Sequence, residues 1–270
     1  MEIIRLIKRF KNFMKFGGQT YIQINQIHKE KLLEEKNIVI TGATSGIGYE
    51  IAKKCVDLGA KVLITGRNKD KLENAKKELN CEVLQWDISD VRVVKEKTAK
   101  IIEIFNGKID CFINNAGIYK EIRYNECSIE DWNKVINTNL TGLYFSTREI
   151  INQCFEPNKK GNIIMVASNR GIFGDDGPYG ISKAGVINFS QGLAKRLLNK
   201  NIRVNAINPG MTASNINKMN DNDNLFKENL KGKRVICAKE IADIVVFLIS
   251  DSSSCITGQI INCDNGETLL

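Results

Sequence analysis

The feature that most constrains the fold is the stretch Asn37–Gly48, NIVITGATSGIG, an apolar run followed at once by three glycines. Residues 38–40 are β-branched without polar alternation, which is typical of a central parallel strand buried on both faces. Gly42 allows a tight turn, Gly46 lets a ligand approach the backbone, and Gly48 lets the next helix pack closely. The start of that helix favours a bound pyrophosphate. This order predicts a dinucleotide-binding fold, against the alternative of an ordinary strand-to-helix turn.

Short apolar runs then alternate with longer helical patterns to the end of the chain. Strands are expected at 37–40, 61–65, 81–86, 110–114, 162–167, 203–207 and 259–262, and helices at 47–58, 69–79, 91–105, within 129–155, 179–198 and 238–249. This alternation predicts an α/β fold, a Rossmann-like doubly wound parallel sheet of about seven strands with helices on both faces. We expect it to form a single dinucleotide-binding domain over 36–270.

Residues 1–35 precede this domain as an N-terminal extension. Apolar residues recur at helical spacing over 1–16 with basic residues between them, which predicts a basic amphipathic helix. Charge alternates with apolar residues where a secretory signal needs an uninterrupted apolar run. We expect this helix to dock on the folded domain or a neighbouring subunit, and attachment to a membrane surface is the less favoured alternative.

Composition excludes several classes of function. The formal net charge is +8, but about half of it lies in the N-terminal extension and no basic stripe is interleaved with aromatic residues, which argues against nucleic-acid binding. The eight cysteines are scattered without a C-x-x-C pair, which indicates reduced thiols in the cytoplasm. With one histidine and no clustered ligands, no metal site is expected.

The end of the second expected strand bears on the choice of cofactor. An NAD-specific fold places a carboxylate here for the ribose 2′-hydroxyl, whereas an NADP-specific fold has an arginine for the 2′-phosphate. Gly66 occupies the position of the acid and Arg67 follows it. This favours NADP, with a solvated turn arginine as the alternative.

Tyr179 and Lys183 form the second informative pattern. Their i to i+4 spacing puts the phenol and the ammonium on one helix face, a turn apart. A nearby cation favours the phenolate, so we expect Lys183 to lower the pKa of Tyr179 and make it a usable proton donor or acceptor. Ser168, at the end of the fifth expected strand, can hydrogen-bond a carbonyl beside that tyrosine.

Six landmarks now stand in a fixed order. They are T-G-x-x-x-G-x-G at Thr41–Gly48, N-N-A-G at Asn114–Gly117, Asn139 within N-T-N-L-T-G, the set Ser168, Tyr179 and Lys183, Pro209-Gly210, and I-T-G-Q at Ile256–Gln259 with Asp264–Gly266. From about 36 to 266 the chain resembles the short-chain dehydrogenase/reductase family, in its compact single-domain branch. It is similar to 3-oxoacyl-[acyl-carrier-protein] reductases.

The resemblance implies a role for each matching residue. Tyr179 would exchange a proton with the carbonyl oxygen as hydride moves, Ser168 would orient that carbonyl, and Lys183 would hold the nicotinamide ribose. Asn139 would anchor a water that connects Lys183 to solvent. The other implied cofactor contacts are Gly42, Ser45, Gly46, Ile47 and Gly48 in the glycine turn, Asp87 and Ile88 at the adenine, Asn114 at the adenosine side, and Thr212 at the nicotinamide amide.

Two departures from the family pattern affect this transfer. Ser168 and Tyr179 are 11 positions apart, about two fewer than is usual in this branch, so the loop 170–178 is trimmed. Ser45 stands where the family often has a basic residue, which leaves Arg67 as the main candidate for a 2′-phosphate. Substrate specificity is expected to depend on loops 170–178 and 211–236.

The resulting hypothesis is an NADP(H)-dependent oxidoreductase that reduces a ketone or aldehyde, either a small molecule or carrier-linked. Two alternatives stay open, an NAD(H)-dependent dehydrogenase of an alcohol or sugar derivative and a cofactor-binding regulatory protein without turnover. The resemblance also implies a homodimer or homotetramer formed through the helices that carry Asn139 and Tyr179, with Gly185 and Gly192 permitting close packing.

Overall fold

The structure is a computed structural model that describes residues 7, 10, 11, 14, 32–214, 217, 219 and 225–269. Most of the amphipathic helix expected in 1–16 lies outside the described residues. Residues 215, 216, 218 and 220–224 of the expected specificity loop 211–236 lie outside them as well.

Seven strands form one sheet, and each neighbouring pair is parallel. The strands are β1 (Asn37–Ile40), β2 (Lys61–Gly66), β3 (Glu82–Gln85), β4 (Cys111–Asn114), β5 (Gly161–Val166), β6 (Ile202–Pro209) and β7 (Ile260–Cys263). Their order is β3-β2-β1-β4-β5-β6-β7. The predicted doubly wound sheet is therefore confirmed.

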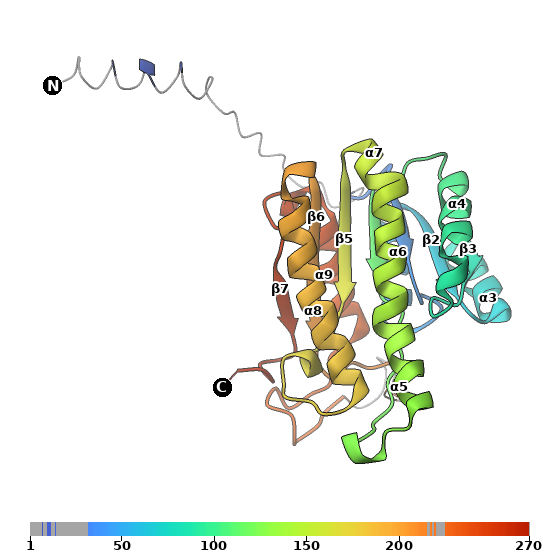
Figure 1. Cartoon of the computed structure of the whole chain (residues 1–270), viewed down its shortest axis with the longest axis vertical. Coiled ribbons are helices and arrows are strands. Elements are labelled where there is room, and N and C mark those ends of the chain that lie inside the picture. Colours follow the sequence, from blue (N-terminus) through green and yellow to red (C-terminus); the bar gives the residue numbers. More distant parts are fainter. Residues whose placement is uncertain are drawn as a thin grey trace.

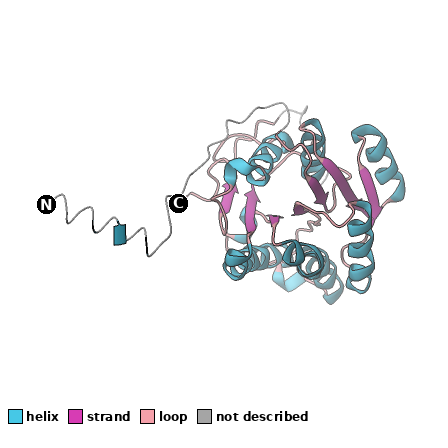
Figure 2. Cartoon of the chain, turned by 90° about the horizontal axis from the view of Figure 1, so that it is seen from above, coloured by secondary structure: helices cyan, strands magenta, loops and turns pink. Residues whose placement is uncertain are grey.

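Helices cover both faces of the sheet (Figures 1 and 2). Those helices are α2 (Gly46–Asp57), α3 (Lys69–Leu79), α4 (Val94–Ile104), α6 (Gly142–Ile150), α8 (Pro178–Leu197) and α9 (Ala238–Ile249). Successive strand residues face opposite sides, so Ile38 and Ile40 pack with α2, α3 and α9, whereas Val39 packs with α4, α6 and α8. The unbroken apolar runs of the strands follow from burial on both faces.

The strand order reverses between β1 and β4, which lie side by side although two strands separate them in the sequence. In parallel α/β sheets the crevice for a ligand lies at this reversal, beyond the carboxyl ends of the strands. The glycine turn follows β1 and the N-N-A-G turn follows β4. Two of the six landmarks therefore flank the crevice.

The long helix expected within 129–155 is interrupted. It consists of α5 (Ile129–Ile136), a π-helical segment at Asn137–Thr141, α6, a second π-helical segment at Ile151–Phe155, and the short α7 (Glu156–Asn158). A π-helical turn inserts an extra residue and rotates the following side chains relative to a regular helix. The first interruption contains Asn139.

Candidate active site

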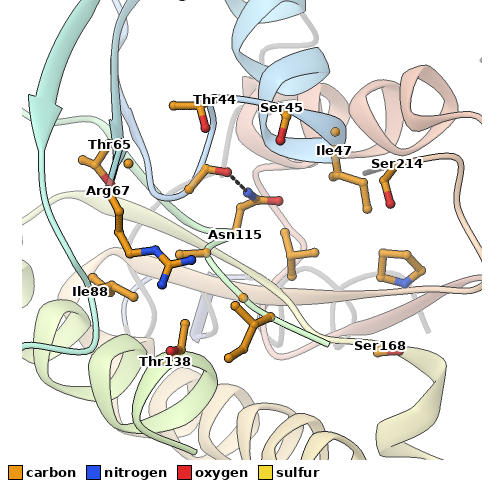
Figure 3. Close-up of a pocket in the computed structure, with 18 of the residues that line it drawn as sticks. Thr44, Ser45, Ile47, Thr65, Arg67, Ile88, Asn115, Thr138, Ser168 and Ser214 are labelled. Carbon is orange, nitrogen blue, oxygen red and sulfur yellow. Dashed lines mark hydrogen bonds between the residues drawn. The ribbon is translucent and has the colours of Figure 1, made fainter. Parts of the chain in front are cut away.

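The glycine turn after β1 needs its glycines for conformation and for close approach. Gly42 and Gly46 have φ of 65° and 61°, in the left-handed region. A Cβ on Gly42 would lie 2.6 Å from the Cα of Ala116, so the turn packs directly against the chain after β4. Asn115 stabilises this contact, because its Nδ2 donates to the carbonyl oxygens of Thr41 and Gly42 at 3.0 and 2.9 Å. Figure 3 shows one hydrogen bond of the Asn115 side chain as a dashed line.

The N-terminus of α2 opens into the same region. Ser45 is its N-cap residue, yet the Ser45 side chain makes no capping hydrogen bond, and the first turn holds no acidic residue. Gly46 and Ile47 line the cavity described below. A Cβ on Gly48 would lie 2.3 Å from Nδ2 of Asn115, so Gly48 packs against the turn after β4. The helix thus presents uncapped N–H groups to an anion.

A cavity of about 370 Å³ runs along the carboxyl edge of the sheet (Figure 3). At one end it is lined by residues that follow β2 and β3, and at the other by Ser168, Tyr179 and Lys183. The glycine turn and the N-N-A-G turn line its middle. A glycine cradle, an uncapped helix end and a basic residue at one end fit a dinucleotide.

The cavity end formed by residues that follow β2 and β3 carries two basic side chains, those of Arg67 and Lys71. Arg67 lines it together with Thr44, Lys71, Asp87 and Ile88. Figure 3 shows Arg67 near Thr65 and Ile88, far from Ser168 along the cavity. In the fold, this is the place where the adenosine ribose would lie.

The structure brings most of the predicted site residues to one cavity. Those that line it are Gly42, Ser45, Gly46, Ile47, Arg67, Asp87, Ile88, Ser168, Tyr179, Lys183 and Thr212. Gly48, Asn114 and Asn139 do not line it. Asn114 is 2% exposed and its Nδ2 donates to Oγ1 of Thr147 at 2.9 Å, because the side chain points into the helix layer beside β4.

Asn139 lies behind the cavity wall, buried in the first π-helical segment. Its Oδ1 accepts from the backbone N–H of Ile118 at 2.8 Å, and its Nδ2 donates to the Ile118 carbonyl oxygen at 2.9 Å and to Oγ of Ser182 at 3.2 Å. These bonds join the chain after β4 to α8. Asn139 is thus placed to hold two cavity walls together.

Lys183 is buried at 4% exposure, and its Nζ donates to the carbonyl oxygen of Val166 at 2.9 Å. Burial lowers the pKa of Lys183 to about 8, because the charged ammonium loses water. A Cβ on Gly117 would lie 3.4 Å from Oδ1 of Asn139 and 3.5 Å from Nζ of Lys183. The two side chains therefore approach each other across this glycine.

Tyr179 sits at the start of α8, with Nζ of Lys183 5.7 Å from the centre of its ring. Burial raises the pKa of Tyr179, and a hydrogen bond with Ser168 acts in the opposite direction. The sequence predicted that Lys183 would lower this pKa. The structure differs, because desolvation of the phenol outweighs the other effects in the protein alone and the Lys183 ammonium is bonded to a backbone carbonyl.

Ser168 follows β5 and is the N-cap of a 3-10 turn at Asn169–Gly171. Its Oγ accepts from the backbone N–H of Arg170 at 3.2 Å, which fixes the start of the loop that leads to Tyr179. The Tyr179 ring also meets the ring of Tyr119 edge-on, with centroids 4.9 Å apart. Ser168, Tyr179 and Lys183 thus form one wall with a hydroxyl, a phenol and an amine.

Several residues that line the cavity were not assigned from the sequence, among them Thr44, Lys71, Asn115 and Thr138. Asn115 has a signal, since it is the second asparagine of the N-N-A-G motif. Lys71 is four positions after Arg67, but α3 contains several lysines and nothing in the sequence distinguishes Lys71 from the others.

Two classes of feature are absent from the described ranges. Within 32–214 and 225–269, and at the few other described positions, no group of three or more His, Cys, Asp and Glu side chains is arranged to hold a metal ion. No helix in that part of the chain is long and apolar enough to cross a membrane.

Comparison with known proteins agrees with this geometry. Residues 42–268 match the family model described as enoyl-(acyl carrier protein) reductase. The chain is 37% identical over 246 residues to a 3-oxoacyl-[acyl-carrier-protein] reductase of Chlamydia trachomatis, covering 87% of this chain and 98% of that protein. It is 33% identical to an acetoacetyl-CoA reductase of an Acinetobacter species, covering 86% and 98%. A solved actinorhodin polyketide ketoreductase with NADPH aligns at a TM-score of 0.81 and 27% identity, over 87% and 98%.

Proposed function

Because the chain belongs to the short-chain dehydrogenase/reductase family and is one of its NAD(P)-dependent oxidoreductases, we propose that it reduces a ketone or aldehyde with NADPH. The observation that carries this proposal is the wall of Ser168, Tyr179 and Lys183 in a cavity that also holds the glycine turn and Arg67. A proton donor and a dinucleotide cradle then share one space. Carbonyl reduction requires both.

In this mechanism Tyr179 donates its phenolic proton to the carbonyl oxygen of the substrate. Its raised pKa keeps the phenol protonated at neutral pH, which suits the reductive direction. Ser168 orients the carbonyl by donating a hydrogen bond to the same oxygen. Lys183, whose Nζ approaches Gly117 as Oδ1 of Asn139 does, holds the nicotinamide ribose and returns a proton to Tyr179. Asn139 anchors a water that connects Lys183 to solvent.

NADPH supplies the hydride when it is bound, and the chain supplies the groups that hold the cofactor. The uncapped first turn of α2 suits the pyrophosphate, with the backbone of Gly46 and Ile47 beside it. Arg67 suits the 2′-phosphate, since a guanidinium pairs with phosphate through two parallel hydrogen bonds. Preference for NADP over NAD rests on Arg67 and on the missing carboxylate at Gly66.

We propose a 3-oxoacyl thioester as the substrate class, held on a carrier or on coenzyme A. Support comes from the relatives, which are named as reductases of 3-oxoacyl-carrier and acetoacetyl-CoA substrates. The family model's description names an enoyl reductase, so reduction of an enoyl thioester instead of a 3-oxoacyl thioester would contradict this substrate class.

The test is a panel of 3-oxoacyl thioesters, enoyl thioesters, simple ketones, aldehydes and alcohols, each assayed with NADPH and NADH or their oxidised forms. Tyr179→Phe is expected to lower turnover by about a hundredfold or more while cofactor binding persists. Turnover that survives this change contradicts the mechanism. Tighter binding of NADH than of NADPH contradicts the cofactor proposal.

We further propose that the chain forms a homodimer or homotetramer in a reducing cytoplasm. Exposed apolar residues gather on α5, α6 and α8, among them Trp132, Tyr144 and Ile181. A face of this kind favours association between copies. All eight cysteines are free thiols, as expected where disulfides do not persist.

A further inference from the structure

The loop between Ser168 and Tyr179 contains one ion pair. Nε of Arg170 donates to Oδ2 of Asp175 at 2.7 Å. The Asp175 side chain is 8% exposed and that of Arg170 is 48% exposed, so a buried carboxylate holds a half-exposed guanidinium. The ion pair between Arg170 and Asp175 thus closes the loop that joins Ser168 to Tyr179.

Asp175 also fixes the start of α8. Its Oδ1 accepts from the backbone N–H of Gly177 at 2.9 Å. A Cβ on Gly180 would lie 2.2 Å from the Cβ of Asp175, so the carboxylate side chain rests directly on the first helical turn. Tyr179 lies in that turn. Asp175 therefore supports the backbone turn that carries the phenol.

Arg170 reaches the same place from the opposite end of the loop. Its backbone N–H donates to Oγ of Ser168, so its position is tied to the hydroxyl beside the phenol. The charges of Arg170 and Asp175 both act on Tyr179 and on Tyr119, with opposite signs. Neither Arg170 nor Asp175 is among the residues that line the cofactor cavity.

We propose that Arg170 and Asp175 are positioning residues that lock the Ser168–Tyr179 loop and set the pH range over which Tyr179 transfers its proton. This inference rests on the proposed function, since it takes Tyr179 as the proton donor. With both partners present the two charges act on the phenol in opposite directions. Removing either one leaves the other uncompensated.

The groups that face Tyr179 come from four places in the chain. Ser168 follows β5, Tyr119 follows β4, Arg170 and Asp175 lie in the loop, and Lys183 lies on α8. The Arg170 charge lowers the pKa of Tyr179 and the Asp175 charge raises it. Glu121 raises the pKa of Tyr119 but is not among the groups acting on Tyr179.

The experiment compares pH profiles of reduction for wild type, Asp175→Asn, Arg170→Gln and the double variant. Reduction needs the protonated phenol, so its rate falls as pH rises through the tyrosine pKa. Asp175→Asn leaves the arginine charge and is expected to move this falling limb to lower pH. Arg170→Gln leaves the carboxylate and is expected to move it to higher pH, and the double variant returns close to wild type.

At a pH on the falling limb, the rates of the two single variants are expected to differ by about threefold or more. Arg170→Lys keeps the charge and is expected to keep the wild-type profile. Asp90→Asn and Arg92→Gln remove the same charges from an exposed pair that follows β3, and are expected to leave the profile unchanged. The proposal is overturned if the rate of Asp175→Asn does not fall at a lower pH than the rate of Arg170→Gln.

A second measurement does not depend on turnover. Ultraviolet difference titration of each variant against the same variant carrying Tyr179→Phe reports ionisation of this phenol alone. The same order of variants is expected, Asp175→Asn lowest and Arg170→Gln highest. If no carbonyl is reduced but this order holds, the proposed function fails and the electrostatic role stands. If turnover occurs and the order is absent, the electrostatic role fails.

Discussion

At the scale of single residues, burial decides the protonation of the candidate site. Tyr179 and Lys183 share one helix face, as the sequence predicted. Burial favours the neutral form of both side chains, because it raises the pKa of Tyr179 and lowers the pKa of Lys183. A neutral phenol is a ready proton donor. A lysine with a pKa of about 8 lies close enough to neutral pH to pass that proton on.

Lys183 gives a pH dependence of stability whose sign can be worked out. Between pH 8 and 10.5 the unfolded chain binds a proton at this residue that the folded chain has lost, so this contribution to the unfolding free energy rises with pH there. Urea unfolding at about pH 7.5 and about pH 10 is expected to show a gain of about 2–3 kcal/mol for wild type relative to Lys183→Met. Lys195→Met, on an exposed position of α8, is the control. If the difference in unfolding free energy between wild type and Lys183→Met is the same at both pH values, the prediction is wrong.

Arg67 is expected to distinguish the two nicotinamide cofactors. Arg67→Ala should weaken NADPH binding by about tenfold to a hundredfold, because a charged hydrogen bond to phosphate contributes about 1.5–3 kcal/mol. NADH binding should change little. Fluorescence titration of both cofactors measures this, with the exposed Arg196→Ala on α8 as the matched control. Equal weakening for NADPH and NADH would remove Arg67 from the 2′-phosphate.

At the scale of elements, the cavity depends on how closely backbones approach one another. The glycine turn meets the chain after β4 at Gly42, and α6 meets the chain after β3 at Gly142. A Cβ on Gly142 would lie 2.1 Å from the carbonyl oxygen of Ile88, a residue of the cavity wall. The π-helical segment before α6 ends at this contact and places Asn139 behind the wall.

Gly142→Ala therefore tests an element contact. The added methyl must push α6 away from Ile88, so the variant is expected to lose about 1–3 kcal/mol of unfolding free energy and to bind cofactor more weakly. Gly174→Ala, in the loop 170–178 with nothing within 4 Å of the new Cβ, is expected to gain about 0.4–1 kcal/mol from the reduced entropy of the unfolded chain. Urea unfolding compares the two. Similar effects from both would show that the Ile88 contact is not what requires glycine.

At the scale of the whole molecule, two helix layers bury one sheet and leave an apolar face outside. Tyr144 packs against Phe189 with ring centroids 4.8 Å apart, which joins α6 to α8 on that face. Of the two glycines expected to permit packing between copies, Gly185 meets Leu140 within the chain, whereas Gly192 faces open space. Only Gly192 is therefore free to contact a second copy.

Tyr144→Glu is expected to lower the oligomeric state, since it places a charge on the face proposed to be buried between copies. Analytical ultracentrifugation measures the change. Ile104→Glu, on α4, is the matched control, because Ile104 is 39% exposed and Tyr144 41%. An oligomer that tolerates Tyr144→Glu would place the interface elsewhere.

The sequence by itself determined the sheet, its parallel strands and the chain positions of the chemistry. Apolar periodicity and the glycine turn predicted each strand to within about two residues, because burial on both faces leaves a local signature. The sequence also predicted that Arg67, Ser168, Tyr179 and Lys183 lie at the carboxyl edge of the sheet, because the end of a strand is a local feature of the sequence.

Only the tertiary structure decided how these residues behave. Desolvation reversed the expected shift at Tyr179, and Asn114 turned away from the cavity toward Thr147, because both depend on neighbours distant in sequence. The π-helical turn at Asn139 and the Arg170–Asp175 pair have no periodic signal either. The glycine turn fixes where a dinucleotide fits, and packing between layers sets the charge state of the groups around it.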